Sequence, residues 1–497
     1  MSVGSIWLCV VWVLQAITSR IRGERLTDRV SHFIRSRHAV LISVVYVLPL
    51  AGMLWTEDVK HGMWDLRMKL PILFLPFVLL TLDRLSANIY RLLSGVFLTS
   101  LIFAVTYCLF IYWQIIPKPF NDVREISVFI SHIRFSLLIV TGLIICFYFG
   151  WKSVAGKVLC VLLSFYFITF LIILSSITGL LVLLAVLIYF VLSKLRSANS
   201  PLMRIGAVVI PLVTAIVIAW LSWSNYVRYT TAPSLNWEAL PKTTALGANY
   251  NHHPEMPLVE DGHYVFTFLA AEEMASAWME VSNVHPDSLD AGGNVISGTL
   301  IRYLASKGLT KDHAGVMQLN NDDIKHIESG IANSADLQKG SLHKRFDNIL
   351  FELSVYKSHG NPSGHSVLQR LEFWRAGLGI FKKNMWIGVG TGDTKSAFKE
   401  EYANIQTQLT KKYQLRAHNQ YLTMFLTYGI VGGLYFIVVM FYPFFDKRKT
   451  TLTVMFGLVA ALAMFTEDTL ESQAGVMFYV VFSIFLGLIV ANKNDTQ

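Results

Sequence analysis

Long apolar runs alternate with short polar segments along most of the chain, and one long polar region interrupts them. The runs have about 13–22 residues, which with their flanks is enough to cross a bilayer as helices. The pattern predicts membrane spans at Ile6–Ile17, Ala39–Leu54, Leu70–Leu82, Leu92–Trp113, Phe135–Gly150, Val158–Leu174, Thr178–Leu192, Ile205–Leu221, Leu422–Tyr442, Leu452–Phe465 and Ala474–Val490. The expected fold is therefore an all-α polytopic membrane protein with about 11 transmembrane helices.

Basic residues in the short loops predict the orientation of these spans. Six arginines lie between Arg20 and Arg37, directly after the first apolar run. Cytoplasmic loops carry an excess of Lys and Arg, so the N-terminus is expected outside and the C-terminus inside. The first run lacks both the basic start and the small-residue cleavage site of a secretory signal, which favours a membrane span.

The polar region divides the chain into three predicted parts. Residues 1–222 form a membrane region of about eight helices, residues 223–417 an extracytoplasmic and mostly helical loop domain, and residues 418–497 a second membrane region of about three helices. The loop domain has an acidic part, 223–340, with 14 acidic and 7 basic residues, and a basic helical part, 341–417, with 6 acidic and 12 basic residues. The basic part fits either a surface resting on anionic headgroups or a site for an anionic substrate.

Composition excludes several other classes of protein. Hydrophobic residues make up 54% of the chain and charged residues only 15%, far from the values of a soluble domain. The net charge of +9 lies largely in short loops and does not indicate nucleic-acid binding. All four cysteines fall in predicted spans, and the histidines show no paired ligand spacing. We therefore expect no disulfide framework, no metal site and no cofactor.

The strongest candidate for chemistry lies where the polar region ends and an apolar helix begins, at Arg416-Ala417-His418-Asn419-Gln420. An imidazole beside a guanidinium at this boundary is suited to acid–base work on a substrate held in the membrane. The alternative is that these side chains only anchor a helix end at the interface. The local sequence alone does not decide between the two.

Further arginines on the same predicted face strengthen the first interpretation. Arg134 opens a span, and Arg370 and Arg375 lie in the basic part of the loop. Each alone is typical of a solvated surface or a helix end, but together with Arg416 they suit a diphosphate, which planar guanidiniums grip with two bonds each. Glu467, Asp468 and Glu471 lie on the same face. They are expected to be solvated, to pair with the arginines or, for Glu467 and Glu471, to contact an acceptor together with Asn419 and Gln420.

A glycine-rich segment, Gly388-Val389-Gly390-Thr391-Gly392-Asp393, is similar at first sight to a phosphate-binding loop. It lacks the Lys-Ser/Thr pair that follows the last glycine of a Walker sequence. Gly388, Gly390 and Gly392 are therefore expected to form a tight turn between helices, with backbone N–H groups near a phosphate as the alternative.

Several of these segments resemble the O-antigen ligase/polymerase superfamily (WaaL- and Wzy-like proteins). The resemblance rests on Arg370-x-x-x-Trp374, the segment 386–393, His418-Asn419-x-x-Leu422 and Gly429-x-x-Gly432. Outside this core, Lys69-Leu70-Pro71, the segment 132–136 and the segment 466–471 resemble its Bacteroidetes-type branch. The chain departs from the family in having about one span fewer than the usual 12, in Ile177 where an arginine is common, and in an acidic insertion at 236–340.

The resemblance implies a metal-independent, inverting glycosyltransferase, multi-pass in the bacterial inner membrane, with its large loop in the periplasm. The donor is a polysaccharide on undecaprenyl diphosphate, and the acceptor of a ligase is a sugar hydroxyl of lipid A-core. His418 is the expected general base, and Arg134, Arg370, Arg416 and Arg375 are the expected diphosphate ligands. A Wzy-type polymerase of O-antigen or exopolysaccharide, a protein O-oligosaccharyltransferase and a transporter of lipid-linked sugars are the alternatives.

Overall fold

The computed structural model describes residues 3–21, 26–82, 87–120, 122–150, 153–196, 234–256, 258–291, 293–338, 366–447 and 449–494, with separate short stretches between 205 and 231 and between 344 and 363. The chain divides into two compact units. The first comprises residues 1–118, 126–208 and 369–497, and the second residues 119–125 and 209–368. Residues 369–417 of the predicted loop domain thus belong to the same unit as the membrane helices.

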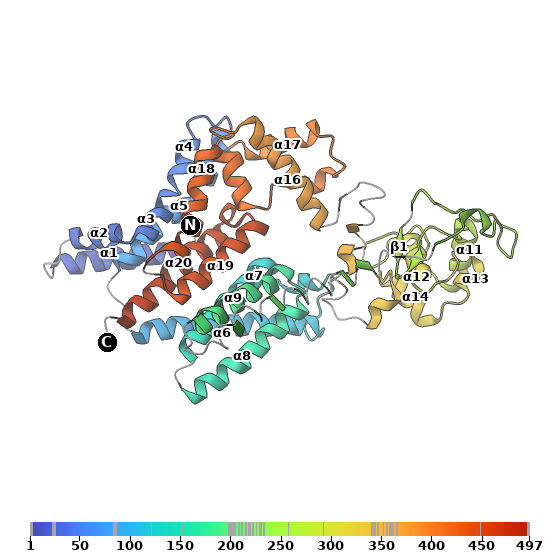
Figure 1. The fold of residues 1–497 in the computed structure, drawn as a ribbon, viewed down its shortest axis with the longest axis horizontal. Helices are drawn as coiled ribbons and strands as arrows, with labels where there is room; N and C mark the ends of the chain where they lie inside the picture. Colours follow the sequence, from blue (N-terminus) through green and yellow to red (C-terminus); the bar gives the residue numbers. More distant parts are fainter. Residues whose placement is uncertain are drawn as a thin grey trace. The chain divides into compact units, whose positions relative to one another are not determined.

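The first unit is helical throughout its described part (Figure 1). Its α-helices are α1 (Val3–Ile21), α2 (Leu26–Arg35), α3 (Arg37–Val44), α4 (Val47–Gly52), α5 (Val59–Thr81), α6 (Ala87–Tyr112), α7 (His132–Gly150), α8 (Val154–Ile173), α9 (Ile177–Arg196), α16 (Ser366–Lys383), α17 (Thr394–Asn404), α18 (Gln420–Phe445), α19 (Thr451–Thr466) and α20 (Gln473–Asn494). Three short 3-10 helices are η1 (Val123–Ile126), where the units meet in sequence, η4 (Lys411–Tyr413) and η5 (Thr469–Glu471).

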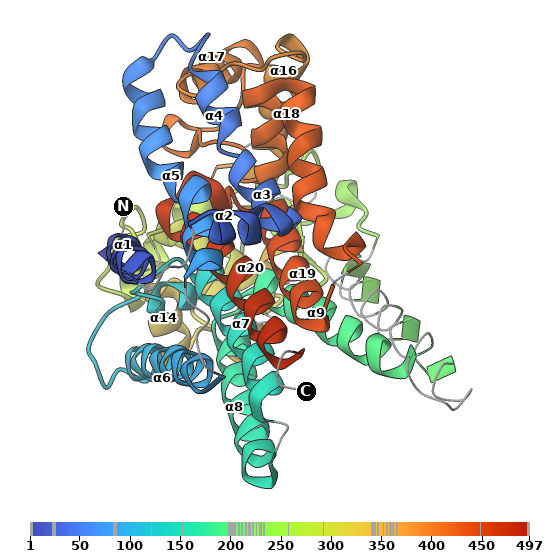
Figure 2. The same cartoon turned by 90° about the vertical axis from the view of Figure 1, so that its left-hand side faces the viewer.

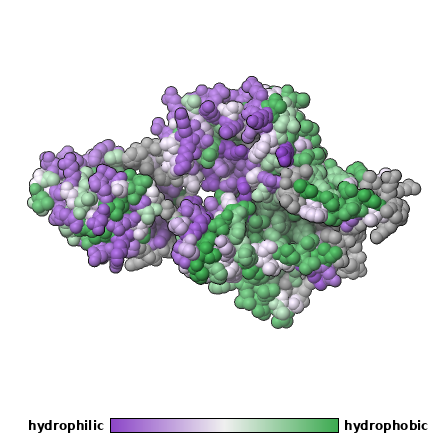
Figure 3. All heavy atoms as spheres, turned by 180° about the vertical axis from the view of Figure 1, so that it is seen from behind, coloured by the Kyte–Doolittle hydropathy of each residue, from purple (hydrophilic) through white to green (hydrophobic). Residues whose placement is uncertain are grey.

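Four of the described helices are long and apolar enough to cross a membrane: Asn88–Tyr112, His132–Phe149, Val154–Ile173 and Gln420–Phe445. Five shorter apolar helices cover Ile6–Thr18, Arg37–Gly52, Ile177–Ser193, Thr451–Thr466 and Gln473–Gly487. Hydrophobic side chains cover much of the lower part of this unit, where α6 to α9 lie (Figure 3). The expectation of an all-α membrane protein is confirmed, whereas most of the predicted span Ile205–Leu221 falls outside the described residues.

The helices pack as neighbours that are often far apart in sequence. α5 packs on α20, and α19 packs on both α18 and α9. Side-chain caps define several helix starts: Asp58 accepts the N–H of His61 at 2.9 Å before α5, and Thr450 forms a capping box with Thr453 before α19. These contacts bring the connection between α19 and α20 next to α5 and the start of α18.

α18 differs from the single span predicted at Leu422–Tyr442 because the chain bends sharply at Gly429. This glycine has φ 67° and ψ −169°, which no helix accommodates. The two arms fold back on each other, since the rings of Tyr421 and Phe436 lie 5.8 Å apart although 15 residues separate them. The arms lie side by side in the upper part of Figure 2. Hydropathy does not reveal this bend, because apolar residues predominate in both arms.

The glycine turn between α16 and α17 packs against this bend. The carbonyls of Leu426 and Thr427 accept the N–H groups of Val389 and Gly390, each at 3.0 Å. A β-carbon at Gly429 would lie 2.1 Å from the carbonyl oxygen of Trp386. The glycines of both segments therefore allow two backbones to meet without intervening side chains.

The second unit is a small helical domain with its own core. Its elements are η2 (Trp237–Ala239), β1 (Val259–Glu260), β2 (His263–Tyr264), α11 (Ala271–Val281), α12 (Ile296–Ser306), α13 (His313–Val316), α14 (Asn321–Glu328) and η3 (Ser334–Gln338). The two strands pair antiparallel, with Val259 opposite Tyr264. Trp278 and Tyr303 are fully buried at the centre of the core. The acidic insertion therefore folds around apolar residues of its own.

We predict that Gly429→Ala destabilises the protein, because the new methyl group meets a carbonyl oxygen and the positive φ disfavours alanine. The cost is about 2 kcal/mol or more, measured as a lower melting temperature of the purified protein in detergent. Gly95→Ala in α6 is the control, since a β-carbon there meets nothing within 4 Å. Equal melting temperatures for the two variants would contradict the bend.

Candidate functional site

Three carboxylates on the short connection between α19 and α20 organise the candidate site. α19 ends at Thr466, Glu467 is extended, and η5 then holds the chain in one tight turn up to Glu471. Glu467, Asp468 and Glu471 therefore lie within five residues. Each of them contacts a different set of groups from α5, α16 or the start of α18, so that the connection joins these helices at one place.

Glu467 brings His418 and Arg370 together. Its Oε2 lies 3.9 Å from His418 Nδ1, and its Oε1 lies 3.7 Å from Arg370 Nη2. The Glu467 side chain is 13% exposed and the imidazole 30% exposed. Burial by itself would raise the pKa of Glu467, but the nearby imidazole and the guanidiniums of Arg370 and Arg134 outweigh it and lower that pKa. The carboxylate is therefore ionised beside three donors.

Asp468 fixes the backbone that carries His418. Its carboxylate accepts the N–H of His418 at 2.9 Å, the N–H of Asn419 at 3.1 Å and the hydroxyl of Thr423 at 2.7 Å. His418 itself has φ 46°, in the left-handed region that side chains other than glycine rarely adopt. Asn419 then caps α18 by accepting the N–H of Leu422 at 3.1 Å. The hydrogen bonds to Asp468 thus fix the backbone from which the imidazole of His418 projects.

Glu471 is the centre of a second group of charges. Its Oε1 lies 2.7 Å from Nζ of Lys69, whose other partner is Asp65 at 2.8 Å, and its Oε2 lies 3.3 Å from Arg416 Nη1. Gln420 donates to Glu471 at 3.3 Å and accepts the N–H of Leu470 at 2.7 Å. Burial would raise the pKa of Glu471, but the charges of Lys69 and Arg416 lower it.

An apolar cavity of about 270 Å³ lies between α7 and α20, next to η5. Its walls include Leu137, Leu138, Met477 and Phe478, and Arg134 is the charged side chain among the described residues that line it. Nε of Arg134 is buried without a hydrogen-bond partner in the described part of the chain. A buried guanidinium N–H at an apolar cavity is a donor available to an anionic ligand with an apolar body.

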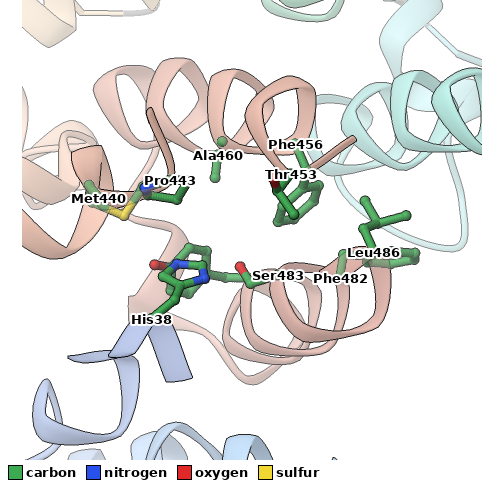
Figure 4. A pocket seen from close by; sticks show the side chains of 11 residues that line it. His38, Met440, Pro443, Thr453, Phe456, Ala460, Phe482, Ser483 and Leu486 are labelled. Carbon is green, nitrogen blue, oxygen red and sulfur yellow. The ribbon is translucent and has the colours of Figure 1, made fainter. Parts of the chain in front are cut away.

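A second cavity, shown in Figure 4, lies between α18, α19 and α20 beside His38. Its volume of about 10 Å³ has room for roughly one water molecule, so it is no substrate site. None of the residues that line it belongs to the charge clusters around Glu467 and Glu471.

The structure thus brings together four of the five residues predicted to act on a donor: His418, Arg134, Arg370 and Arg416. Arg375 lies elsewhere, 63% exposed and 3.6 Å from Glu372. Five residues correspond to about 500° of helical rotation, so it points about 140° away from Arg370. Gly388 and Gly390 lie at the α18 bend, whereas Gly392 lies against Thr56 and Asp58 before α5. No group of His, Cys, Asp or Glu in the described part of the chain has the arrangement of a metal site.

Sequence reasoning assigned no role to Asp65, Lys69 or Thr423, and none to Asp468 beyond its place on the outer turn. The spacing of Asp65 and Lys69, four residues apart before an apolar run, is the one sequence feature that indicates a paired charge. The use of Asp468 as a backbone acceptor leaves no trace in the sequence. It depends on the fold bringing residue 468 to residue 418.

Part of the chain is similar to a known protein family. Residues 321–437 match the family model described as O-antigen ligase (Wzy_C), a range that contains α16, α17, the glycine turn, His418 and most of α18. Arg134 and the connection with Glu467 lie outside the matched range. No curated protein matches the chain.

We predict that the two lowered glutamate pKa values make stability depend on pH. Below the ordinary glutamate pKa of 4.5, the unfolded chain binds protons that the folded chain does not. The ionised carboxylates of Glu467 and Glu471 therefore contribute their full stabilisation above this pH. That stabilisation is lost as the pH falls through their lower pKa values in the folded protein. Glu471→Gln should melt at lower temperature at pH 7 and lose less stability between pH 6 and pH 3, all measured by thermal unfolding in detergent.

Glu400→Gln is the matched control, because this glutamate is exposed on α17. It should retain the melting temperature and the pH dependence of the unmodified protein. An unchanged pH dependence in Glu471→Gln would contradict the role of this carboxylate. The apolar helices indicate a membrane protein, and residues 321–437 are similar to the O-antigen ligase family.

Proposed function

We propose that the protein is an O-antigen ligase-like glycosyltransferase that moves a polysaccharide from undecaprenyl diphosphate to a sugar hydroxyl of lipid A-core. The reaction takes place at the periplasmic face of the inner membrane, where the loop domain 223–417 also lies. The observation that carries the proposal is the arrangement around Glu467, where one imidazole and two guanidiniums surround one carboxylate beside an apolar cavity. The O-antigen ligase match supports the same class of chemistry.

His418 is the proposed general base. Glu467 faces its Nδ1, which favours the tautomer with the proton on Nδ1 and leaves Nε2 free to accept a proton. The ionised Glu467 also stabilises the imidazolium that forms when the acceptor hydroxyl loses its proton. The imidazole is partly exposed, as a group that meets an incoming hydroxyl must be.

Arg134, Arg370 and Arg416 are the proposed partners of the donor diphosphate. Arg370 and Arg134 lie within electrostatic reach of Glu467, and Arg416 lies on Glu471 next to the start of α18. Guanidinium groups bind diphosphate oxygens in pairs and stabilise the charge that grows on the leaving group. Both glutamates have lowered pKa values, so they stay ionised and pair with these cations until the diphosphate binds.

The cavity between α7 and α20 suits the polyprenyl part of the donor. Its lining is apolar apart from Arg134 and Thr469, so a lipid tail there keeps the diphosphate at the Arg134 end. This order of groups follows the chemistry of the donor, whose apolar tail ends in a diphosphate and then the reacting sugar. The anomeric carbon is thereby held near the interface rather than in water.

The bond changes balance without a metal or a cofactor. The acceptor oxygen forms a bond to the anomeric carbon, the bond from that carbon to the diphosphate oxygen breaks, and the acceptor proton moves to His418. The diphosphate leaves on the side opposite the attack, which inverts the anomeric configuration. Undecaprenyl diphosphate and the imidazolium remain, and the latter returns its proton to water.

We predict that His418→Ala lowers glycan transfer by about 10²–10⁴-fold, the usual contribution of a general base. The assay combines the purified protein with undecaprenyl diphosphate-linked glycan and lipid A-core and follows the glycosylated acceptor on a gel. Protein yield and melting temperature are measured alongside, to separate chemistry from folding. Transfer at the rate of the unmodified protein would remove His418 from the mechanism.

Two arginines on the same helix provide a matched pair. Arg370→Ala is expected to lower transfer about 10²-fold, because a charge that stabilises the leaving group is lost. Arg375→Ala leaves the cluster intact and should keep transfer within about threefold of the unmodified protein. Equal losses in both variants would mean that the charge of α16, and not the position of Arg370, matters.

A Wzy-type polymerase or a protein O-oligosaccharyltransferase would use the same groups with a different acceptor. The glycans that accumulate in cells lacking the protein distinguish a ligase from a polymerase. Loss of polymer from lipid A-core with long lipid-linked chains still present favours the ligase, whereas loss of chain length itself favours a polymerase.

A transporter of lipid-linked sugars is the remaining alternative. The bend at Gly429 and the buried pair of Asp65 and Lys69 are features that transporters also use. Glycan transfer by purified protein in detergent, where no compartments exist, would exclude transport as the sole activity.

A further inference from the structure

The exposed face of α16 has an unusual composition. The helix positions that are exposed are Leu371, Arg375, Leu378, Lys382 and Lys383, and no carboxylate is among them. Successive spacings of four, three and four residues place the first four on one side of the helix. Leu371 is 47% exposed and Leu378 is 49% exposed, although both are large apolar residues. This face combines apolar and cationic side chains only.

The chain that follows α16 continues this pattern. Met385, Trp386 and Ile387 are 38%, 75% and 58% exposed. They precede the glycine turn, whose backbone is held by Leu426 and Thr427 of α18. The N–H of Ile430 donates to the carbonyl of Met385 at 2.8 Å, so the exposed indole lies beside the α18 bend.

The neighbouring surface of α18 is apolar as well. Val431, Leu434 and Val438 on the second arm are 72%, 53% and 56% exposed. This arm, from Ile430 to Phe445, is apolar along most of its length. In the space-filling view, hydrophobic residues gather along one edge of the upper part of this unit, next to a hydrophilic surface (Figure 3). The apolar residues after α16 therefore continue a surface that faces lipid.

The other side of α16 is fixed to the candidate site. The ring of Phe373 lies 5.6 Å from that of His418, and Trp374 contacts Phe465. At the far end of the helix, Met385 meets Ile430. α16 thus runs alongside the first arm of α18, from the site to the bend, and presents its apolar and cationic face away from both.

We propose that α16 and the segment 385–387 form a lipid-binding surface in the bilayer leaflet nearest the Gly429 bend. The leucines and Trp386 lie among acyl chains and the lipid interface, and Lys382 lies at the level of anionic headgroups. An interfacial helix typically combines leucine, tryptophan and basic residues in this way, and tryptophan is enriched at the interface. The partner is an anionic bilayer surface, because the face is cationic at Lys382, while Arg375 and Lys383 pair with the shielded carboxylates of Glu372 and Glu401. Residues inside the predicted loop domain thereby become part of the membrane surface.

The surface is tested by placing a fluorophore on it. Trp386→Cys and Leu378→Cys are made in a Cys9→Ala background, since the other three cysteines are buried, and labelled with an environment-sensitive dye. Lys399→Cys on α17 is the control, because this exposed lysine lies outside the proposed surface. The labelled proteins are reconstituted in vesicles with or without phosphatidylglycerol, and quenching by lipid-borne nitroxide is compared with quenching by aqueous iodide.

The label at Trp386 is expected to be quenched at least about threefold more by the nitroxide than by iodide, and the label at Lys399 in the opposite sense. At position 378 the nitroxide effect should increase with phosphatidylglycerol. Iodide quenching at Trp386 equal to that of the control would overturn the proposal. Protection from both quenchers would also overturn it, because a protein surface and not lipid would then cover this face. Neither outcome bears on glycan transfer, so the test is independent of the proposed activity.

Discussion

The connection between α19 and α20 holds the candidate site together by electrostatics. Three carboxylates, those of Asp65, Glu467 and Glu471, meet four cations, those of Lys69, Arg134, Arg370 and Arg416, while Asp468 accepts backbone N–H groups. Most of these groups are largely shielded from water, where removal of one partner from an ion pair costs roughly 3–5 kcal/mol. These ion pairs therefore fix the helices that carry them to one place, in addition to the packing of their side chains.

The pairing of carboxylates with cations limits how much a diphosphate gains by binding at the site. Each cation already has a carboxylate within electrostatic reach, so a diphosphate gains only the difference between its own contacts and those it replaces. Nη2 of Arg370 lies 3.7 Å from Glu467, beyond hydrogen-bond distance, and Nε of Arg134 is buried without a hydrogen-bond partner in the described part of the chain. Lys69, with contacts of 2.7 and 2.8 Å, is the more tightly held cation and is suited to a structural role.

The sequence is sufficient for the class of fold and for much of the candidate site. Runs of apolar residues reveal most helices because lipid-facing helices have to be apolar on every side that meets lipid. His418 and the arginines stand out because they share the predicted outer face of the membrane. The bend at Gly429 escapes this reasoning, since the apolar run continues on both sides of it. Asp468 escapes it as well, because its partners are backbone N–H groups 49 and 50 residues away, which every residue possesses.

At His418, the backbone conformation and the side-chain chemistry are required for different reasons. Asp468 accepts backbone N–H groups, so its contacts require only a residue that tolerates φ 46° at position 418. The interaction with Glu467 requires the imidazole itself. Glycine satisfies the first demand without cost and leaves the second as an empty space of imidazole size. The scaffold and the chemical group are therefore separable at this position, and free imidazole supplied from solution could occupy the space that the side chain leaves.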